Sequence, residues 1–303
     1  MKNLKTSSIG LAVIIALAGS GCKDKNNDII LPPIGGYNTS NDVAASSLKA
    51  YWNFDGSLNE TKSSAAPVSS LRTSFVTGIK GQAVKLDSGY ILYPTIAALN
   101  TTSGSLTIST WIFTQNQGNG SRPTGVVALT AGSTQTDWNV GPMILTLENG
   151  RPVTYNDTLV LKANITTYKS GIRLQGDNLN DFGIRETDFK TVKGANKWVH
   201  MVGRYDGSGS FLDIFANGVR VSNNNFRFRE VGGVGFGPMA YQSGTQTQVL
   251  VGGYPNTTTG FPNSPLAGFQ GLFRGNIDQV RIYDKSLTDD EILSLYQLEL
   301  AGR

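Results

Sequence analysis

From Leu48 onward, short apolar runs alternate with polar positions, and Gly, Asn and Pro separate one run from the next. Runs of this kind, with turn residues between them, are typical of an antiparallel β-sandwich. One hairpin has the clearest pattern. Apolar positions alternate over residues 212–216, Asn217-Gly218 supplies a tight turn, and the alternation resumes over 219–221.

Further strands and one helix are predicted toward the C-terminus. Residues 249–253 and 273–284 follow the strand pattern, and Asp278 alternates in phase with the apolar residues of its strand. This phase predicts that its carboxylate points toward the packed side. Helical periodicity is clear only after Thr288-Asp289-Asp290-Glu291, a capping-box pattern with acidic residues in the first turn. These acids have a local structural role, so we do not count them as catalytic.

The N-terminus has the layout of a secretion signal. Lys2 and Lys5 precede an apolar run from Ile9 to Ala18, and small residues lead on to Cys22. An apolar run of about ten residues is too short to span a bilayer. Cys22 is the only cysteine, which excludes an internal disulfide and leaves its thiol free for another use.

The segment from Leu17 to Cys22 resembles a bacterial lipoprotein signal, in which the cysteine is lipidated and becomes the first residue of the mature chain. The resemblance implies that residues 1–21 are a signal peptide and that Cys22 carries a membrane anchor; an ordinary cleaved signal is the alternative. Residues 22–47 are predicted to be a flexible tether. Charged residues directly after Cys22 resemble the export signal of surface lipoproteins, so we expect the protein on the outer membrane, facing the cell exterior.

A series of motifs resembles the bacterial laminin-G-like domain. They are KAYWNFDG at 49–56, GIKGQAV at 78–84, SLTISTWI at 105–112, KWVH at 197–200, NG at 217–218, GNIDQVRIYD at 275–284 and LTDDEI at 287–292. The resemblance implies that residues 48–303 form a concanavalin A-like jelly roll, an all-β sandwich of two antiparallel sheets with a short C-terminal helix. The stretches near 115–195 and 222–270 depart most from the motifs, and we expect individual specificity to lie there.

Composition narrows the class of protein. Charged residues make up 16% of the chain and hydrophobic residues 39%, and there are 36 glycines. This balance favours many turns between short strands and argues against a disordered chain. The formal net charge is +4, but Lys2 and Lys5 belong to the predicted signal, so the mature chain is nearly neutral. No basic cluster provides the footprint of nucleic-acid binding, and no nucleic-acid partner is expected.

Candidate catalytic residues are few. The glutamates are scattered, and none lies in the Glu-x-Asp-x-Glu arrangement that places the acid and the nucleophile of a jelly-roll glycosidase on one strand face. His200, the only histidine, lies in a strand motif, where a structural role is expected. A single Cys and a single His do not make a zinc or redox-metal centre. We therefore predict that the chain is not an enzyme, with a glycosidase or lyase as an alternative.

Calcium requires only oxygen ligands, so two aspartates need separate consideration. A buried and unpaired Asp278 carboxylate would be costly, and Asp55 lies in the turn after an apolar strand motif. Related sandwich domains often carry one structural calcium ion, and the resemblance makes Asp55 and Asp278 the candidate ligand pair. A hydrogen-bonded turn with a salt bridge is an equal alternative.

Aromatic rings with nearby amides are a common means of binding sugars. Three of the four tryptophans lie in apolar strand motifs and are expected in the core: Trp52, Trp111 and Trp198. Trp138, Tyr241 and Tyr254 instead lie in polar, Gly- and Gln-rich surroundings. We name these three as candidate ligand-binding residues; the alternative is that they anchor loops onto the sandwich.

Together, these patterns predict a lipid-anchored cell-surface module that binds a polysaccharide or another glycan and does not transform it. An accessory subunit of an outer-membrane nutrient transporter is the alternative, because the anchor, the tether and the long loops would serve a protein partner equally well.

Overall fold

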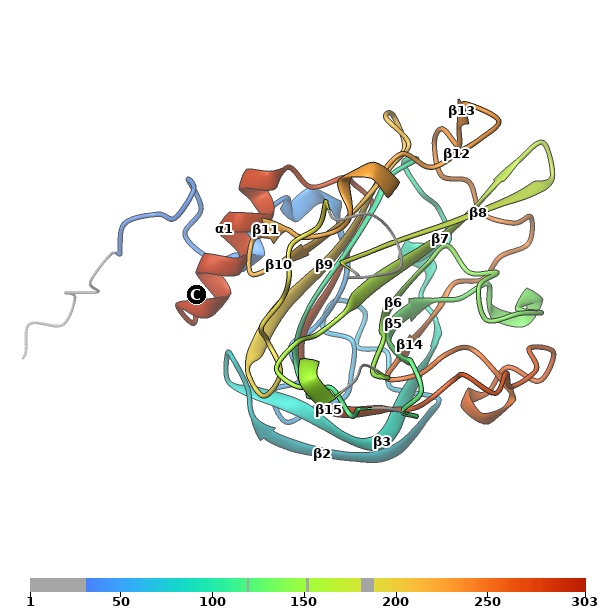
Figure 1. Ribbon diagram of the computed structural model, residues 1–303. Helices are drawn as coiled ribbons and strands as arrows, with labels where there is room; N and C mark the ends of the chain where they lie inside the picture. Colours follow the sequence, from blue (N-terminus) through green and yellow to red (C-terminus); the bar gives the residue numbers. More distant parts are fainter. Residues whose placement is uncertain (1–30, 119, 151–152, 181–187) are drawn as a thin grey trace, which may run out of the picture. The chain divides into compact units, whose positions relative to one another are not determined.

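Thirteen strands pair into one antiparallel sheet that curls over on itself (Figure 1). The computed structural model describes residues 31–118, 120–150, 153–180 and 188–303, and Pro33–Arg303 form one folded unit. In spatial order the strands are β11 (Val219–Arg220), β10 (Phe211–Ala216), β9 (Trp198–Asp206), β4 (Leu106–Phe113), β15 (Phe273–Tyr283), β3 (Gln82–Thr95), β14 (Gln248–Val251), β5 (Thr124–Leu129), β6 (Met143–Leu147), β7 (Leu161–Lys169) and β8 (Ile172–Leu179), while β1 (Leu48–Trp52) pairs with β15 and β2 (Ser69–Thr77) pairs with β3. A separate small hairpin consists of β12 (Glu230–Val231) and β13 (Val234–Gly235).

The long strand β3 joins the two halves of the sheet. Its residues 84–89 pair with β15, and its residues 91–95 pair with β14. The sheet curls at β3, so that the half from β14 to β8 faces the half from β11 to β15. A Cβ atom on Gly203 of β9 would lie only 2.4 Å from a methyl carbon of Leu145 on β6, so the two halves are in direct contact. The predicted sandwich is confirmed, and its two layers are parts of one curled sheet.

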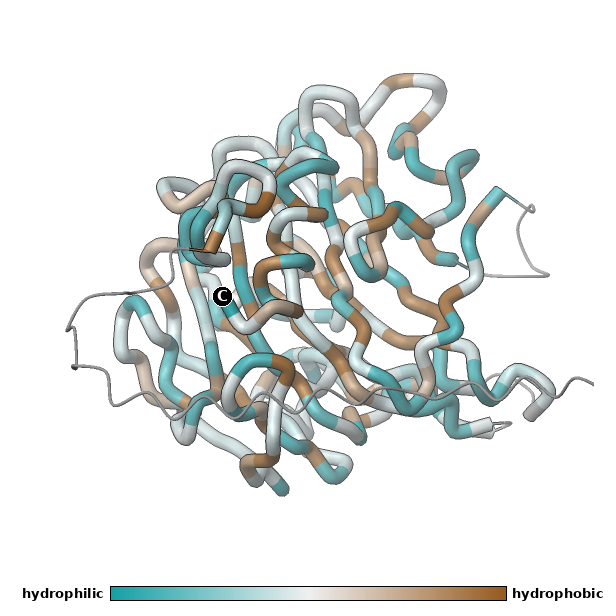
Figure 2. The backbone as a smooth tube through the Cα atoms, turned by 90° about the vertical axis from the view of Figure 1, so that its left-hand side faces the viewer, coloured by the Kyte–Doolittle hydropathy of each residue, from teal (hydrophilic) through white to brown (hydrophobic). Residues whose placement is uncertain are grey.

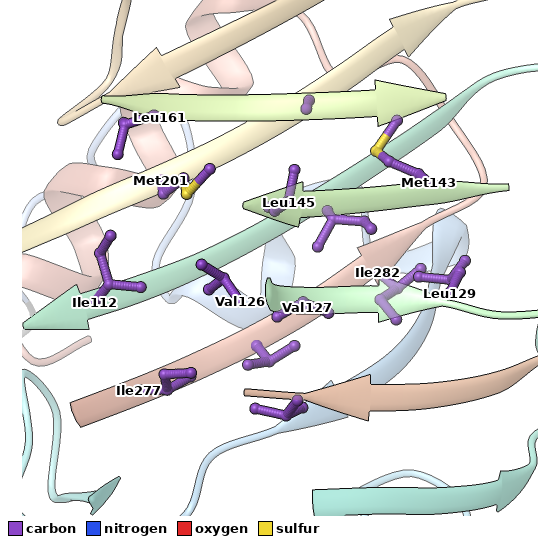
Figure 3. Close-up of a cluster of buried hydrophobic side chains, with 14 of the residues drawn as sticks. Ile112, Val126, Val127, Leu129, Met143, Leu145, Leu161, Met201, Ile277 and Ile282 are labelled. Carbon is purple, nitrogen blue, oxygen red and sulfur yellow. The ribbon is translucent and has the colours of Figure 1, made fainter. Parts of the chain in front are cut away.

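The apolar core lies between the two halves. Figure 3 shows Ile112 and Met201, from the first half, near Leu145 and Leu161 from the second, and all four are at most 1% exposed. Hydrophobic and hydrophilic residues alternate along the strands (Figure 2), as the sequence pattern predicts. Burial of this apolar surface is the main favourable term that holds the layers together.

The two elements with the clearest local signals form as predicted. Strands β10 and β11 make a hairpin whose turn residues Asn217 and Gly218 have φ angles of 51° and 77°. Both lie in the left-handed region that a tight hairpin turn requires. The helix α1 spans Asp289–Leu300, and the Thr288 side chain accepts a hydrogen bond from the Glu291 amide in a capping box.

Helix α1 covers the outer face of the first half of the sheet (Figure 1). A second buried cluster lies beneath it: Val43, Leu48, Tyr51, Val202, Phe215, Tyr283, Leu287, Ile292, Leu295 and Leu298. Within the described part of the chain, no helix combines the length and the apolar character needed to cross a membrane.

Residues 33–47 belong to the folded unit, which corrects the prediction of a flexible tether for this part of 22–47; residues 22–30 lie outside the described residues. Val43 is fully buried in the cluster beneath α1, and Ser40, in a 3-10 helix over Ser40–Asp42, is also fully buried. The Ser40 amide donates to the Arg303 carbonyl oxygen at 3.2 Å. The predicted signal peptide and the predicted lipidation site, Cys22, lie outside the described residues.

A buried ion pair joins the N-terminal segment, the sheet and the helix. Arg281 of β15 donates from Nε to Glu299 of α1 at 2.7 Å, and both side chains are completely buried. Glu299 also accepts from Trp111 Nε1 at 2.7 Å, while Arg281 donates to the side chains of Asn41 and Ser40. A buried pair whose remaining donors and acceptors are satisfied in this way is costly to break from one side.

We predict that Glu299→Gln lowers the free energy of unfolding by about 3–5 kcal/mol, because the Arg281 charge would stay buried without its counter-ion. The matched control is Asp87→Asn, which breaks the Asp87–Arg274 pair of 63–67% exposed side chains and is expected to cost under about 1 kcal/mol. Urea unfolding followed by fluorescence measures both. A Glu299→Gln protein as stable as the control would contradict the proposed role of the pair.

Candidate functional site

Three aromatic rings gather on the outer face of the second half of the sheet. Trp138, from the loop between β5 and β6, lies with its ring centroid 5.5 Å from that of Tyr254 and 5.8 Å from that of Phe269. The Tyr254 and Phe269 centroids are 5.6 Å apart, and all three contacts are edge-to-face. Phe269 is 42% exposed and Trp138 is half-buried, so these two rings present surface to solvent. We call Trp138, Tyr254 and Phe269 the aromatic cluster.

The loop after β14 holds the aromatic cluster in place. Tyr254 packs on apolar residues that face outward from β14, β5 and β6, among them Leu250, Ala128 and Ile144. Its carbonyl oxygen accepts from the Thr259 hydroxyl at 2.7 Å, and the Asn256 amide group donates to Gln270 at 2.8 Å. Gln270 follows Phe269 in the chain, so the loop is tied at both ends next to the rings.

The three aromatics predicted as ligand-binding residues do not form one site. Trp138 and Tyr254 come together, but Tyr254 is only 3% exposed, and burial raises the pKa of its hydroxyl. Its ring therefore supports Trp138 and offers no free face for stacking. Tyr241 packs against the main core between the layers, in the role of a loop anchor, and burial raises its pKa too. Sequence reasoning missed Phe269, and the only signal was its place between Gly268 and Gln270 in a loop-like stretch.

A polar strip lies next to the aromatic cluster and consists of side chains of β7 and β8 together with Asn139 and Glu148, which flank β6. The Asn139 carbonyl oxygen, one residue after Trp138, accepts from Thr166 Oγ1 of β7 at 2.5 Å and from Gln175 Nε2 of β8 at 3.2 Å. Further along the same strands, Lys162 Nζ lies 3.4 Å from Glu148 and 3.1 Å from Asp177. All three charged side chains are 21–26% exposed.

The polar strip supplies what saccharide hydroxyls need, namely ammonium and amide donors beside carboxylate acceptors. It also contains the carboxylates Glu148 and Asp177, which share the Lys162 ammonium. Such a triplet is typical of a structural ion-pair network. Glycoside hydrolysis requires one carboxyl group of a pair to donate a proton to the leaving oxygen.

His200 and the three tryptophans of the strand motifs have structural roles. His200 is completely buried, its Nε2 lies 2.7 Å from Ser109 Oγ, and burial lowers its pKa to about 3. Trp52 lies in the core and Trp111 lies beneath α1, as expected for buried strand residues. Trp198 does not lie in the core as predicted: Val199 and Met201 of β9 point inward, so Trp198 is half-buried on the outer face, where it packs edge-on against Phe113.

Asp55 and Asp278 both contact the turn between β2 and β3. Asp278 Oδ2 accepts from the amides of Ile79 and Lys80 at 2.9 Å and 3.3 Å. Its Oδ1 accepts from the Gln279 amide at 2.7 Å, and Asp55 Oδ1 accepts from the Gln82 amide at 2.6 Å. The turn approaches closely, because a Cβ atom on Gly78 would lie 2.4 Å from Asp278 Oδ2.

The alternation of β15 predicts that Asp278 lies on the same side of the sheet as the apolar residues of its strand. In the structure it lies on the opposite side. A bulge interrupts the strand after Asp278, where Gln279 has a φ of 49°, and the register resumes at Arg281. Ile277 therefore points into the core, whereas Asp278 lies opposite Trp111 on the outer face. The extra residue shifts the alternation by one position.

The described residues fit the hydrogen-bonded alternative for Asp278 better than the calcium site. Both carboxylate oxygens of Asp278 face N–H donors, which repel a cation. No group of three or more His, Cys, Asp or Glu side chains is placed to hold a metal ion anywhere in the described ranges. Burial raises the pKa of Asp278 to about 7, and the surrounding amides act in the opposite direction. The calcium ion remains a prediction.

Comparison with known proteins identifies the family. The model of the concanavalin A-like lectin/glucanases superfamily matches residues 86–293, so the chain belongs to this superfamily. The expected laminin-G-like and concanavalin A-like fold is thereby confirmed. A search of curated proteins gave no significant match.

Three solved structures illustrate the likeness, which at these identities concerns the fold alone. The binding domain of botulinum neurotoxin serotype D/C VPI 5993 has a TM-score of 0.51 at 14% identity and matches 84% of this chain and 52% of that one. The serotype D ligand-binding domain, solved with N-acetylneuraminic acid, gives 0.51 at 13% identity over 85% and 52%. Domain 4 of an extracellular arabinanase from Geobacillus stearothermophilus, solved with arabinotriose, gives 0.49 at 17% identity over 83% and 98%. This chain thus matches about half of each neurotoxin domain.

We predict that Asp278→Asn destabilises the protein by about 1–3 kcal/mol, because an amide nitrogen would replace one oxygen that now faces backbone N–H donors. Asp55→Asn should cost less, since rotation of the amide keeps an oxygen toward the single Gln82 donor. Thermal melts with and without a chelator complete the test. A melting temperature that falls on chelation in the wild type, but not in Asp278→Asn, would restore the calcium site.

Proposed function

We propose that the protein is a non-catalytic carbohydrate-binding module, anchored by lipid to the outer surface of the cell. The observation that carries the proposal is the aromatic cluster beside the polar strip. Phe269 and Trp138 are accessible on one face of the sheet, and the hydrogen-bonding side chains of Thr166 on β7 and Gln175 on β8 lie on the same face. An apolar ring face together with oriented donors and acceptors is the combination by which proteins bind pyranose rings.

Two further points support the proposal, the first for carbohydrate as the ligand and the second for binding over catalysis. The superfamily description names lectins as well as glucanases, and both engage saccharides. Lys162 lies between Glu148 and Asp177 and pairs with both, so neither carboxylate lies in the apolar surroundings of a general acid. An assay for reducing sugars or unsaturated products, run on any polysaccharide that binds, tests this part; turnover at enzymatic rates would overturn it.

The carbohydrate prediction is that Trp138→Ala and Phe269→Ala each weaken glycan binding by about tenfold, since each removes one apolar ring from the proposed platform. Phe75→Ala on β2 is the matched control, because Phe75 is 38% exposed and Phe269 is 42% exposed. A glycan array selects the ligand and calorimetry measures its affinity. Equal losses in all three variants, or an array with no bound glycan, would contradict the proposal.

The anchor is proposed from the sequence of the N-terminus. Replacing Cys22 by alanine is expected to move the protein from the membrane fraction to the soluble fraction, because acyl chains add about 0.8 kcal/mol of membrane affinity per buried methylene. Mass spectrometry of the wild-type protein should show an acylated N-terminal cysteine. Surface exposure is tested with a protease added to intact cells. If a stoichiometric outer-membrane transporter co-purifies with the protein, and no glycan on the array binds, the accessory role is favoured instead.

A further inference from the structure

A hollow of about 290 Å³ lies at the bend of the sheet, behind the loop that carries Tyr254 and Phe269. Two arginines, Arg72 of β2 and Arg122 before β5, line it, and no Asp or Glu does so among the described residues. Neither guanidinium group has a hydrogen-bond or ion-pair partner in the described part of the chain. Two unpaired arginines at one hollow concentrate positive charge on a nearly neutral protein.

The backbone around the hollow is strained. Arg72 has a φ of 50° and Ser88 of β3 has a φ of 53°, and both lie where the β2–β3 register shifts. Ten non-glycine residues of the described chain have a left-handed φ, and two of them line this one hollow. Strained residues of this kind gather where a side chain has to be aimed at a ligand. Here the strained positions carry a guanidinium and a hydroxyl group.

A buried amide provides an independent indication of a ligand. Gln270 lines the hollow and is only 3% exposed. Its Oε1 accepts from Asn256 Nδ2 at 2.8 Å and from the Ala267 amide at 3.2 Å, which fixes the orientation of the side chain. Its Nε2 consequently has no acceptor in the described residues. Buried N–H groups without an acceptor are uncommon, and an oxygen-rich ligand would satisfy this one.

Part of the wall of the hollow is apolar. Leu266 and Leu272 line it together with the hydroxyl-bearing Thr258. Apolar walls suit the C–H face of a sugar ring, whereas hydroxyls and an amide suit its oxygens. Paired guanidinium groups bind carboxylate, sulfate and phosphate through fork-like N–H donors. The chemistry therefore combines a saccharide body with an anionic group.

We propose that this hollow binds an acidic sugar, whose carboxylate or sulfate group is held by Arg72 and Arg122. The inference deepens the proposed carbohydrate-binding function and rests on it. The loop over residues 254–272 forms the aromatic cluster on one side and contributes Asn256, Leu266 and Gln270 to the hollow on the other. We therefore expect that, when one unit of a sugar chain stacks on Phe269, a neighbouring acidic sugar unit contacts the two arginines.

The test uses two matched pairs of oligosaccharide probes and the full-length protein. One pair is oligogalacturonate and its methyl ester, and the other is a sulfated galactan oligosaccharide and its desulfated form. Calorimetry is expected to show at least tenfold tighter binding of one acidic probe than of its neutral counterpart, and the preferred pair identifies the anionic group. Equal affinities within both pairs would overturn the inference.

Variants assign the effect to the hollow. Arg72→Asn keeps a residue that tolerates a left-handed φ, and Arg122→Gln removes the second charge. In the double variant the preference for the acidic probe is expected to disappear, whereas Arg122→Lys should retain part of it. Lys197→Gln, at an exposed position before β9, is the control for loss of one positive charge. Melting temperatures identify any variant that fails to fold.

The outcomes separate this inference from the proposed function. Neutral glycans that bind in a Phe269-dependent manner, without any acidic preference, would leave the carbohydrate-binding function in place and remove the acidic sugar site. A preference for the acidic probe that persists in the double arginine variant would likewise keep the carbohydrate-binding function and remove the acidic sugar site. If no probe and no glycan on the array binds, the proposed function itself fails.

Discussion

The Arg281–Glu299 ion pair is the interaction on which the arrangement of the first half of the sheet depends. Both charges are buried, so each needs the other and the polar groups around them. To satisfy the pair, α1 must lie flat on β15 and β4, and the segment with Ser40 and Asn41 must close over the arginine. The Tyr51 ring, 3.9 Å from the Arg281 guanidinium carbon, completes the enclosure. One pair of charges thus fixes the helix, the N-terminal segment and two strands relative to one another.

This packing covers much of the outer face of the first half, whereas the aromatic cluster and the polar strip lie on the second half. The helix and the N-terminal segment cover the strands from β10 to β15, where even His200 and Trp111 are buried. On the other layer, the loop after β14 leaves Phe269 and Trp138 accessible beside the polar strip. The bend in β3 makes this division possible, because it turns one sheet into two layers with separate outer faces. The strained positions that border the arginine-lined hollow lie where β2 and β3 shift register.

The sequence predicts those parts of the fold whose causes are local. The Asn217-Gly218 turn and the Thr288 capping box depend on neighbours within a few residues, and both form as expected. The orientation of Asp278 depends on how β15 fits β4, and no local pattern announces the bulge at Gln279. Residues 33–47 look like a polar tether because the arginine that orders them is 240 positions away from Asn41. One of the three rings of the aromatic cluster, Phe269, cannot be predicted from the sequence for the same reason, since the exposure of Phe269 and the burial of Tyr254 are decided by packing of a loop on a distant strand face.

The folded unit begins and ends in the same place. Arg303 accepts from the Ser40 amide through its carbonyl oxygen and donates from its side chain to the Asn38 carbonyl, so the end of the folded unit lies against the 3-10 helix over Ser40–Asp42. A short peptide could therefore join the two ends, and the domain is suited to circular permutation, with new termini opened in an exposed loop elsewhere. A fluorescent protein fused after Arg303 would emerge beside α1, on the layer opposite the aromatic rings, and would leave them unobstructed.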